Sequence, residues 1–215
     1  DFFAMFELEF TFGGAWSKEI DQVGSPVAVI SESMNGKLFG GENSVGKTIM
    51  LDSKPYTING VVKNYAPSPK FYDLNNGSFR EGEDIFLPLS LAPTYEYPSW
   101  GNNNSWKVET INTFQQKLQS ETVWMQYWVE LDSEEAQQQY QDYLAAYVTE
   151  QQKIGRFTRK DAAGYIKNVQ QWLDNRGVVG KDSRVLVGLS FMFLVVCLVN
   201  TIGLLLAKFL RRAPQ

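Results

Sequence analysis

Residues 27–62 read VAVISESMNGKLFGGENSVGKTIMLDSKPYTINGVV, and this stretch decides the fold of the chain. Its first residues, Val27–Ile30, are all apolar and predict a short buried strand. Thr48–Leu51 and Tyr56–Val62 are rich in β-branched and aromatic residues, and the turn-forming residues 52–55 separate them. The stretch therefore predicts a strand, a connecting segment and a hairpin.

The connecting segment carries the signals of a short helix. Ser31 is a typical N-cap residue, and Gly40 or Gly41 can take the left-handed conformation that ends a helix. Three apolar residues recur at helical spacing and should share one face: Met34, Leu38 and Phe39. We expect the order strand, helix, hairpin.

Residues 41–48, GENSVGKT, match the phosphate-binding pattern G-x4-G-K-[ST] letter for letter. A phosphate-binding loop needs a buried strand before it and a helix after it, because its amides and the helix N-terminus surround the phosphates together. Here the expected helix comes first, and the β-branched Thr48 and Ile49 favour a strand. We therefore predict a glycine turn with no nucleotide-binding residues and no bound cofactor.

The segment Val185–Ala207 contains no charged residue. At about 1.5 Å per residue, a helix of this length crosses roughly 30 Å of hydrocarbon. A buried helix of a soluble core is the alternative, but such helices rarely stay apolar on every face for so long. We predict a transmembrane helix at 185–207, with a juxtamembrane link at 181–184 and the start of a cytoplasmic segment at 208–215.

The charges near the C-terminus suggest an orientation. Lys208, Arg211 and Arg212 follow the span closely, so the positive-inside rule puts the C-terminus in the cytoplasm and residues 1–184 outside. These three residues carry +3 of a whole-chain charge of −4, which leaves −7 for the outer part and argues against a nucleic-acid partner. Because the chain begins abruptly at Asp1 without a signal peptide, we expect an export signal or an earlier span upstream.

Composition restricts the chemistry of these residues. There is no histidine, and the single cysteine, Cys197, lies inside the span, so a Ser-His-Asp triad, a Cys-His pair, a His/Cys zinc site and a disulfide are excluded. Glu81, Glu83 and Asp84 could bind calcium or act as a carboxylate pair, but such clusters are usually solvated. We predict no catalytic residues and no metal ligands.

Further elements follow from periodicity. Phe6–Phe10 alternates between apolar and polar residues and predicts a half-buried strand. Asp84–Leu89 predicts a strand whose proline favours an edge or strand-end position, and 123–131 predicts a strand with both faces covered. The aromatic loop 92–106 is either a contact surface or a loop packed onto the core, and we favour packing.

A long helix should begin near Asp132–Glu135, where a cap and negative first-turn charges suit a helix N-terminus. Its apolar residues form one stripe, which we expect to pack onto a sheet: Ala136, Tyr140, Tyr143, Leu144, Tyr147 and Val148. Residues 165–173 are apolar enough to pack, and 177–180 link them to the membrane.

Four parts of residues 27–62 resemble the periplasmic core domain of MacB-type ABC transporter permeases: Val27–Ser33, Lys37–Gly40, Val45–Ile49 and Tyr56–Val62. In that family a serine-led helix ends in leucine-phenylalanine, a turn follows, and glycine-lysine-threonine opens a hairpin strand. A second segment, Asn200–Pro214, is similar to the end of the second membrane helix of these permeases.

The resemblance implies an α/β (α+β mixed), two-subdomain extracytoplasmic core at residues 1–180, N-terminally incomplete, that precedes the second of four membrane helices. It implies a MacB/FtsX-type permease of the bacterial inner membrane, working as a dimer with an ABC-type ATP-binding subunit or domain in export or mechanotransmission. Whether a periplasmic adaptor and an outer-membrane channel take part stays open, as does the substrate.

Two functions of other classes remain as alternatives. The chain could be an extracytoplasmic sensor or binding domain on a single-span anchor, which no ATPase would accompany. An ectoenzyme that uses only carboxylates is the third reading, and it would depend on Glu81 or Glu83.

Overall fold

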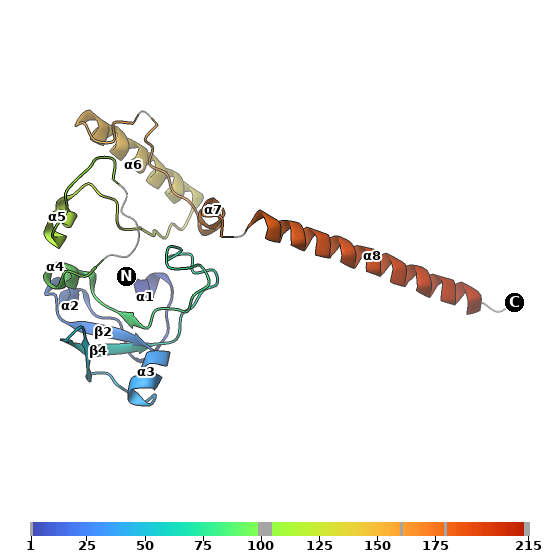
Figure 1. Cartoon of the computed structure of the whole chain (residues 1–215), viewed down its shortest axis with the longest axis horizontal. Helices are drawn as coiled ribbons and strands as arrows, with labels where there is room; N and C mark the ends of the chain where they lie inside the picture. The colour runs from blue at the N-terminus through green and yellow to red at the C-terminus, as the bar shows by residue number, and fades with distance from the viewer. Residues whose placement is uncertain (1, 99–104, 160, 179, 213–215) are drawn as a thin grey trace. The chain divides into compact units, whose positions relative to one another are not determined.

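The computed structural model describes residues 2–98, 105–159, 161–178 and 180–212. It separates into two compact units, Asp1–Ile166 and Lys167–Gln215. The first unit contains a five-stranded sheet with helices, and the second contains a long apolar helix (Figure 1). This is the mixed α+β fold class with a C-terminal apolar helix that the sequence predicts.

The elements of the first unit are, in chain order, α1 (Phe2–Met5), β1 (Phe10–Gly13), α2 (Lys18–Gln22), β2 (Val27–Ser31), α3 (Glu32–Phe39), β3 (Thr48–Leu51), β4 (Lys54–Val62), β5 (Ile85–Phe86), the 3-10 turn η1 (Leu89–Leu91), α4 (Ala92–Tyr95), α5 (Phe114–Gln119) and α6 (Glu134–Lys153). The second unit contains α7 (Val169–Asn175) and α8 (Lys181–Arg212).

The sheet is organised around β4. Strand β2 runs parallel to β4, whereas β1 and β3 run antiparallel to it. Strand β5 completes the order β1-β4-β2-β5 as an edge strand, which agrees with the edge position expected from its proline-containing sequence. It is shorter than predicted, because only Ile85 and Phe86 pair with β2.

The core lies on both faces of β2. Every residue of this strand is buried, and Ala28 and Ile30 belong to one apolar cluster with Ile58 of β4. Val29 points to the other face, where it packs with Phe3 of α1. Because successive strand residues alternate between faces, the uninterrupted apolar run of β2 is explained by a sheet that is covered on both sides.

The order strand, helix, hairpin is confirmed across residues 27–62. The Ser31 hydroxyl accepts a hydrogen bond from the Met34 amide at 3.0 Å, and Gly40 takes the left-handed conformation with φ 67°. Met34 and Phe39 pack on the core, but the prediction for Leu38 was wrong, since its side chain is 53% exposed. The buried residue of this helix is Asn35, whose side chain donates to the Glu42 carbonyl and accepts from the Ser44 hydroxyl.

The N-terminal prediction needs correction. Residues 6–9 do not form a strand; Phe2–Met5 is a helix, a turn follows, and β1 begins only at Phe10. The aromatic ring of Phe3 packs against Trp16, with 5.3 Å between ring centroids, and this contact favours the helix over continued alternation. Burial of large aromatic side chains outweighs a short alternating pattern.

The structure also contradicts the strand at 123–131. Only Val123 forms an isolated bridge there, and no strand element is present. Trp124 and Trp128 face inward, with ring centroids 5.7 Å from Phe114 and 5.2 Å from Phe71. The opposite side is exposed rather than covered: Val123, Met125, Tyr127 and Val129. Alternation identified an extended segment correctly, but a strand also requires a paired neighbour.

Helix α6 begins as predicted, with Ser133 as its N-cap. It packs differently from the prediction, because Tyr143 and Tyr147 are exposed and no residue of α6 is fully buried. Its partner within the unit is an extended segment and not a sheet: the Gln141 side chain bonds the Gly164 carbonyl and accepts from the Ile166 amide.

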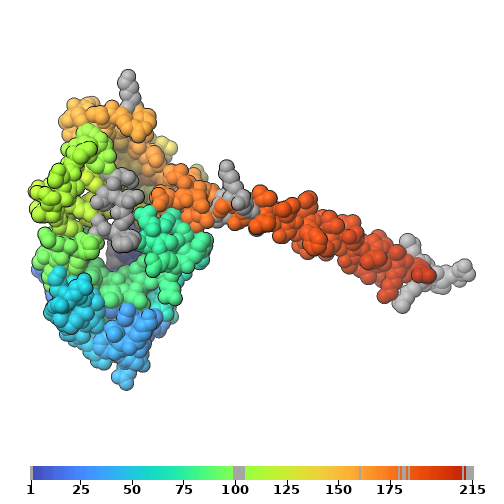
Figure 2. All heavy atoms as spheres, in the orientation of Figure 1, coloured from blue at the N-terminus to red at the C-terminus, as the bar shows by residue number. Residues whose placement is uncertain are grey.

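The second unit contains a helix with the length and composition of a membrane span. The candidate span Val185–Phe209 lies within α8 and extends the predicted span by two residues. All of its side chains are exposed, as expected for a helix that packs against lipid or other membrane helices. Figure 2 shows the face of this helix that is in view.

Candidate functional site

A buried ammonium group organises the long connection between β4 and β5. The side chain of Lys70 is only 7% exposed, and it forms an ion pair with Glu83. Its Nζ lies 3.8 Å from the Asp73 carboxylate and donates to the Glu81 carbonyl oxygen at 3.4 Å. A buried cation needs such partners, because an unpaired one is strongly disfavoured. Lys70 therefore holds two distant parts of the connection together.

Tyr72 completes this charged cluster. Its hydroxyl donates a hydrogen bond of 2.6 Å to Glu83 Oε2, and the Lys70 ammonium lies 5.6 Å from its ring centroid. Burial raises the pKa of Tyr72 above its usual value, and the hydrogen bond to Glu83 raises it further. The phenol therefore stays protonated as a donor at neutral pH.

Aromatic rings surround the cluster on one side. Tyr72 contacts Phe2, Phe6 and Tyr65, with ring centroids 5.4, 5.8 and 5.9 Å away. The neighbouring Phe71 reaches Trp128 of the extended segment. The cluster thus joins the N-terminal helix, the connection and a later part of the chain.

The three acidic residues singled out from the sequence all contact other residues of the chain. Glu83 bonds Lys70 and Tyr72, while the Asp84 carboxylate accepts from the Ser31 hydroxyl at 2.8 Å. Glu81 contributes its backbone carbonyl to Lys70. Within the part of the chain that the structure describes, no group of three or more His, Cys, Asp or Glu side chains could hold a metal ion. The Glu83 carboxylate thus joins the connection to Lys70, and the Asp84 carboxylate joins it to Ser31.

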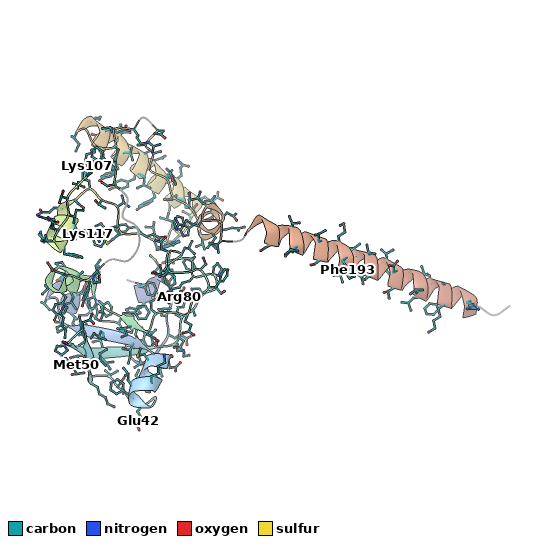
Figure 3. All side chains as sticks on the ribbon, in the orientation of Figure 1. Glu42, Met50, Arg80, Lys107, Lys117 and Phe193 are labelled. Atoms are coloured by element: carbon teal, nitrogen blue, oxygen red, sulfur yellow. The ribbon has the colours of Figure 1, made fainter. Side chains whose placement is uncertain are left out.

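The octet at 41–48 lies between α3 and β3, which is the reverse of a phosphate-binding loop. Its amides bond the protein itself: Gly46 N–H donates to the Ile58 carbonyl at 2.8 Å, and Lys47 N–H donates to the Ser44 carbonyl at 3.0 Å. The Ser44 hydroxyl is buried and donates to Asn35 Oδ1. Glu42 lies at the exposed tip of the turn (Figure 3). This geometry fits a structural turn.

A second charged cluster centres on Glu121. Its carboxylate accepts from Trp106 Nε1 at 2.7 Å and Lys107 Nζ at 3.1 Å, and it lies 3.1 Å from Arg156 Nε. Lys107 also pairs with Glu109. Burial raises the pKa of Glu121, but the ion pair with Arg156 and the hydrogen bonds from Lys107 and Trp106 outweigh it and lower the pKa overall. The cluster ties the segment before α5 to the end of α6.

In the described residues of the aromatic loop 92–106, Tyr95 and Tyr97 pack onto the core, as we favoured from the sequence. The hydroxyls of Tyr56 and Tyr97 are 2.5 Å apart. Trp106 is partly exposed and bonds Glu121. Trp100 and the three asparagines lie outside the described residues.

Lys70, Tyr72 and Arg156 were not predicted from the sequence. Their partners lie at distant positions along the chain and share no local spacing pattern. The one available signal was Lys70 in an otherwise aromatic stretch, KFY at 70–72, where a cation needs a nearby acid. These contacts can hold loops in one conformation. The feature that bears on the location of the protein is α8, which has the length and composition of a membrane span.

Comparison with known proteins identifies a matching family. A family model described as the MacB-like periplasmic core domain matches residues 1–147. No curated protein matches the chain.

Two solved structures are similar. One is the periplasmic region of MacB from Actinobacillus actinomycetemcomitans, at 25% identity over 40% of this chain and 42% of that chain, with a TM-score of 0.28. The other is the extracellular domain of the noncanonic ABC-type transporter YknZ from Gram-positive bacteria, at 20% identity over 43% and 41%, with a TM-score of 0.32. The matches thus span about two fifths of each solved chain.

Proposed function

The chain belongs to the family of MacB-like periplasmic core domains, and from this premise we propose that it is part of an ABC transporter permease. In this proposal residues 1–184 lie on the outer side of the membrane and α8 is one of the helices that cross it. The observation that carries it is the order of the two parts: a family core over 1–147, then a helix of membrane-spanning length.

The orientation in this proposal rests on the family and not on charge. Lys181 and Arg184 precede the span, while Lys208, Arg211 and Arg212 follow it, so basic residues flank both ends. A MacB-like core would be periplasmic. The C-terminus would then lie on the cytoplasmic side of a bacterial inner membrane. Cysteine labelling from each side in a Cys197→Ser background tests this assignment.

We further propose that the chain transmits the effect of cytoplasmic ATP hydrolysis to the outer domain. An ATP-binding subunit or domain and a second permease subunit are the partners that this requires. The transported substrate is not part of the proposal, because the described loops offer no chemistry that selects one.

The short link before α8 supports this proposal. Residues 176–180 separate α7 from α8, so little chain is available to absorb a movement. We expect a flexible glycine-serine insertion after Gly180 to uncouple transport from ATP hydrolysis in the assembled complex. The matched control is the same insertion after Gly155, an exposed glycine beyond the end of α6. Equal transport by both variants would contradict the proposal.

Purification with a partner tests the function most directly. Detergent extraction of the full protein from its host should recover an ABC-type ATPase, and Lys47→Ala should leave the ATPase activity of the complex unchanged. Loss of hydrolysis in a folded Lys47→Ala variant would restore a nucleotide role for the octet. Recovery of the chain without any ATPase would favour a sensor on a single-span anchor.

A further inference from the structure

Helix α7 is short but clearly two-sided. Val169, Trp172 and Leu173 recur at helical spacing, and Arg176 follows on the same side. The opposite side is polar: Gln170, Gln171, Asp174 and Asn175. The side chain of Val169 is 40% exposed, and Trp172 and Leu173 remain partly exposed. A helix with this pattern suits a boundary that is apolar on one side and aqueous on the other.

The covalent chain keeps α7 close to the membrane span. Gly177 has φ 65°, and the Val178 amide donates back to the Leu173 carbonyl at 3.1 Å, so the chain is still at the end of α7 at residue 178. Lys181 begins α8, and Val185 begins the span. Three extended residues reach at most about 10 Å, and four helical residues add about 6 Å. The end of α7 therefore lies within about 16 Å of the hydrocarbon.

The side chains on this face suit a lipid headgroup layer. Tryptophan is enriched where membrane meets water, because its ring is apolar and its N–H can bond there. The Arg176 guanidinium lies 5.2 Å from the Trp172 ring centroid, so a cation and an indole occur together at the end of the face. Tryptophan and arginine side by side match the apolar and phosphate parts of a lipid interface.

Local charge agrees with an anionic lipid surface. Four basic residues lie between 167 and 184, against only Asp174 and Asp182: Lys167, Arg176, Lys181 and Arg184. This part of the chain is therefore positive, although residues 1–184 as a whole are acidic. A basic segment beside a span is attracted to acidic headgroups.

We propose that α7 lies in the headgroup layer of the leaflet that faces residues 1–184, with Val169, Trp172 and Leu173 toward the acyl chains and Arg176 on lipid phosphate. The partner is the acidic phospholipid of the same bilayer that α8 crosses. This inference rests on the membrane span and not on ATP coupling, so it can hold if the proposed coupling fails.

Site-directed spin labelling of the full chain tests the placement. In a Cys197→Ser background, single cysteines replace Val169 on the apolar face and Gln170 on the polar face, and a third replaces Val195 in the middle of the span. The protein is reconstituted in vesicles of phosphatidylcholine with a minority of phosphatidylglycerol. We expect the label at 169 to collide more with oxygen than with an aqueous nickel chelate, and the label at 170 to show the reverse.

The outcomes distinguish the interfacial placement of α7, the membrane span and the choice of an acidic lipid. A label at 169 that reports water while the label at 195 reports lipid would overturn the interfacial placement and keep the span. Water at both positions would overturn the span and the inference with it. Arg176→Glu should move the label at 169 toward water, and this shift should be larger with phosphatidylglycerol than in pure phosphatidylcholine. An equal shift in both lipids would contradict the choice of an acidic lipid partner.

Discussion

The first unit contains two parts that are held together differently. In residues 2–98, β2 is buried along its whole length, and Ala28, Val29 and Ile30 have no exposed surface. In the described residues of 105–166, only Phe114 and Lys117 are buried, and the twenty residues of α6 include none. Apolar packing dominates the first part, whereas hydrogen bonds and ion pairs around Gln141 and Glu121 dominate the second.

This difference predicts where the unit opens first. Apolar burial contributes about 25 cal/mol per Å², while partly exposed ion pairs contribute about 0–1 kcal/mol each and weaken with salt. The part at 105–166 should therefore exchange its amide hydrogens at lower free energy than the sheet. A region that opens locally is suited to respond to a partner.

Replacing a core residue should give the largest effect. Ile30→Ala removes a fully buried side chain from β2 and should lower the free energy of unfolding by about 2–5 kcal/mol. The matched change Leu144→Ala in the half-buried stripe of α6 should cost clearly less. Denaturant titrations followed by far-ultraviolet circular dichroism measure both. Equal losses would mean that the second part has a core of its own.

Removing a buried charge should come next. Lys70→Met leaves the Glu83 carboxylate without its cation and should cost about 1–3 kcal/mol, less than for full burial because Glu83 is 29% exposed. Lys107→Met, at a side chain that is 39% exposed, should cost clearly less, because solvent screens the ion pair. Adding Glu83→Gln to Lys70→Met should recover part of the loss. A double variant as unstable as the sum of both changes would argue against the pairing.

The two serine N-caps offer a smaller, matched test. Ser31→Ala removes the cap of α3 and should cost about 1 kcal/mol. Ser133→Ala removes the cap of α6, where the hydroxyl accepts from the Ala136 amide. The effect at Ser31 should be larger, because its hydroxyl also donates to Asp84. If thermal unfolding ranks the two variants the other way, the hydroxyl of Ser31 stabilises less than its contacts suggest.

The smallest expected effect is a loss of stability at alkaline pH. Burial and the bond to Glu83 raise the pKa of Tyr72 in the folded protein, so the folded state keeps the proton when the unfolded chain loses it. Stability is therefore complete below about pH 10, the pKa of an unfolded tyrosine, and falls as the pH rises toward the folded pKa. Tyr97 has a raised pKa for a similar reason and adds to this loss.

Tyr72→Phe should make the loss of stability above pH 10 less steep, whereas Tyr127→Phe, at a side chain that is 80% exposed, should leave it unchanged. Melting temperatures measured in steps across this pH range provide the comparison. The same slope in both variants would show that the Tyr72 hydroxyl does not titrate through the folded state as its contacts imply.

The parts of the fold that the sequence could predict are those with local causes. Ser31, Gly40 and the hairpin turn act within a few residues, so strand, helix and hairpin were predictable. The exposed face of 123–131 and the partner of α6 depend on which elements lie nearby, and alternation alone does not specify a neighbour.

The charged clusters follow the same rule. The acids at 81–84 could be identified in the sequence. The role of Lys70 could be identified only from the structure, where it pairs with Glu83. Pairing of this kind depends on tertiary contact, which no spacing pattern encodes.

The pairing pattern of the sheet has a consequence for the order in which it assembles. Strands β3 and β4 are joined by the two residues Asp52 and Ser53, so their hairpin closes the shortest loop and can form within microseconds. Strand β1 must bring Phe10 to Val62, and β5 must bring Phe86 back to Val29. Because closing longer loops costs more entropy, we expect these two strands to join late, and a chain emerging during synthesis can complete the sheet only after residue 86 is free.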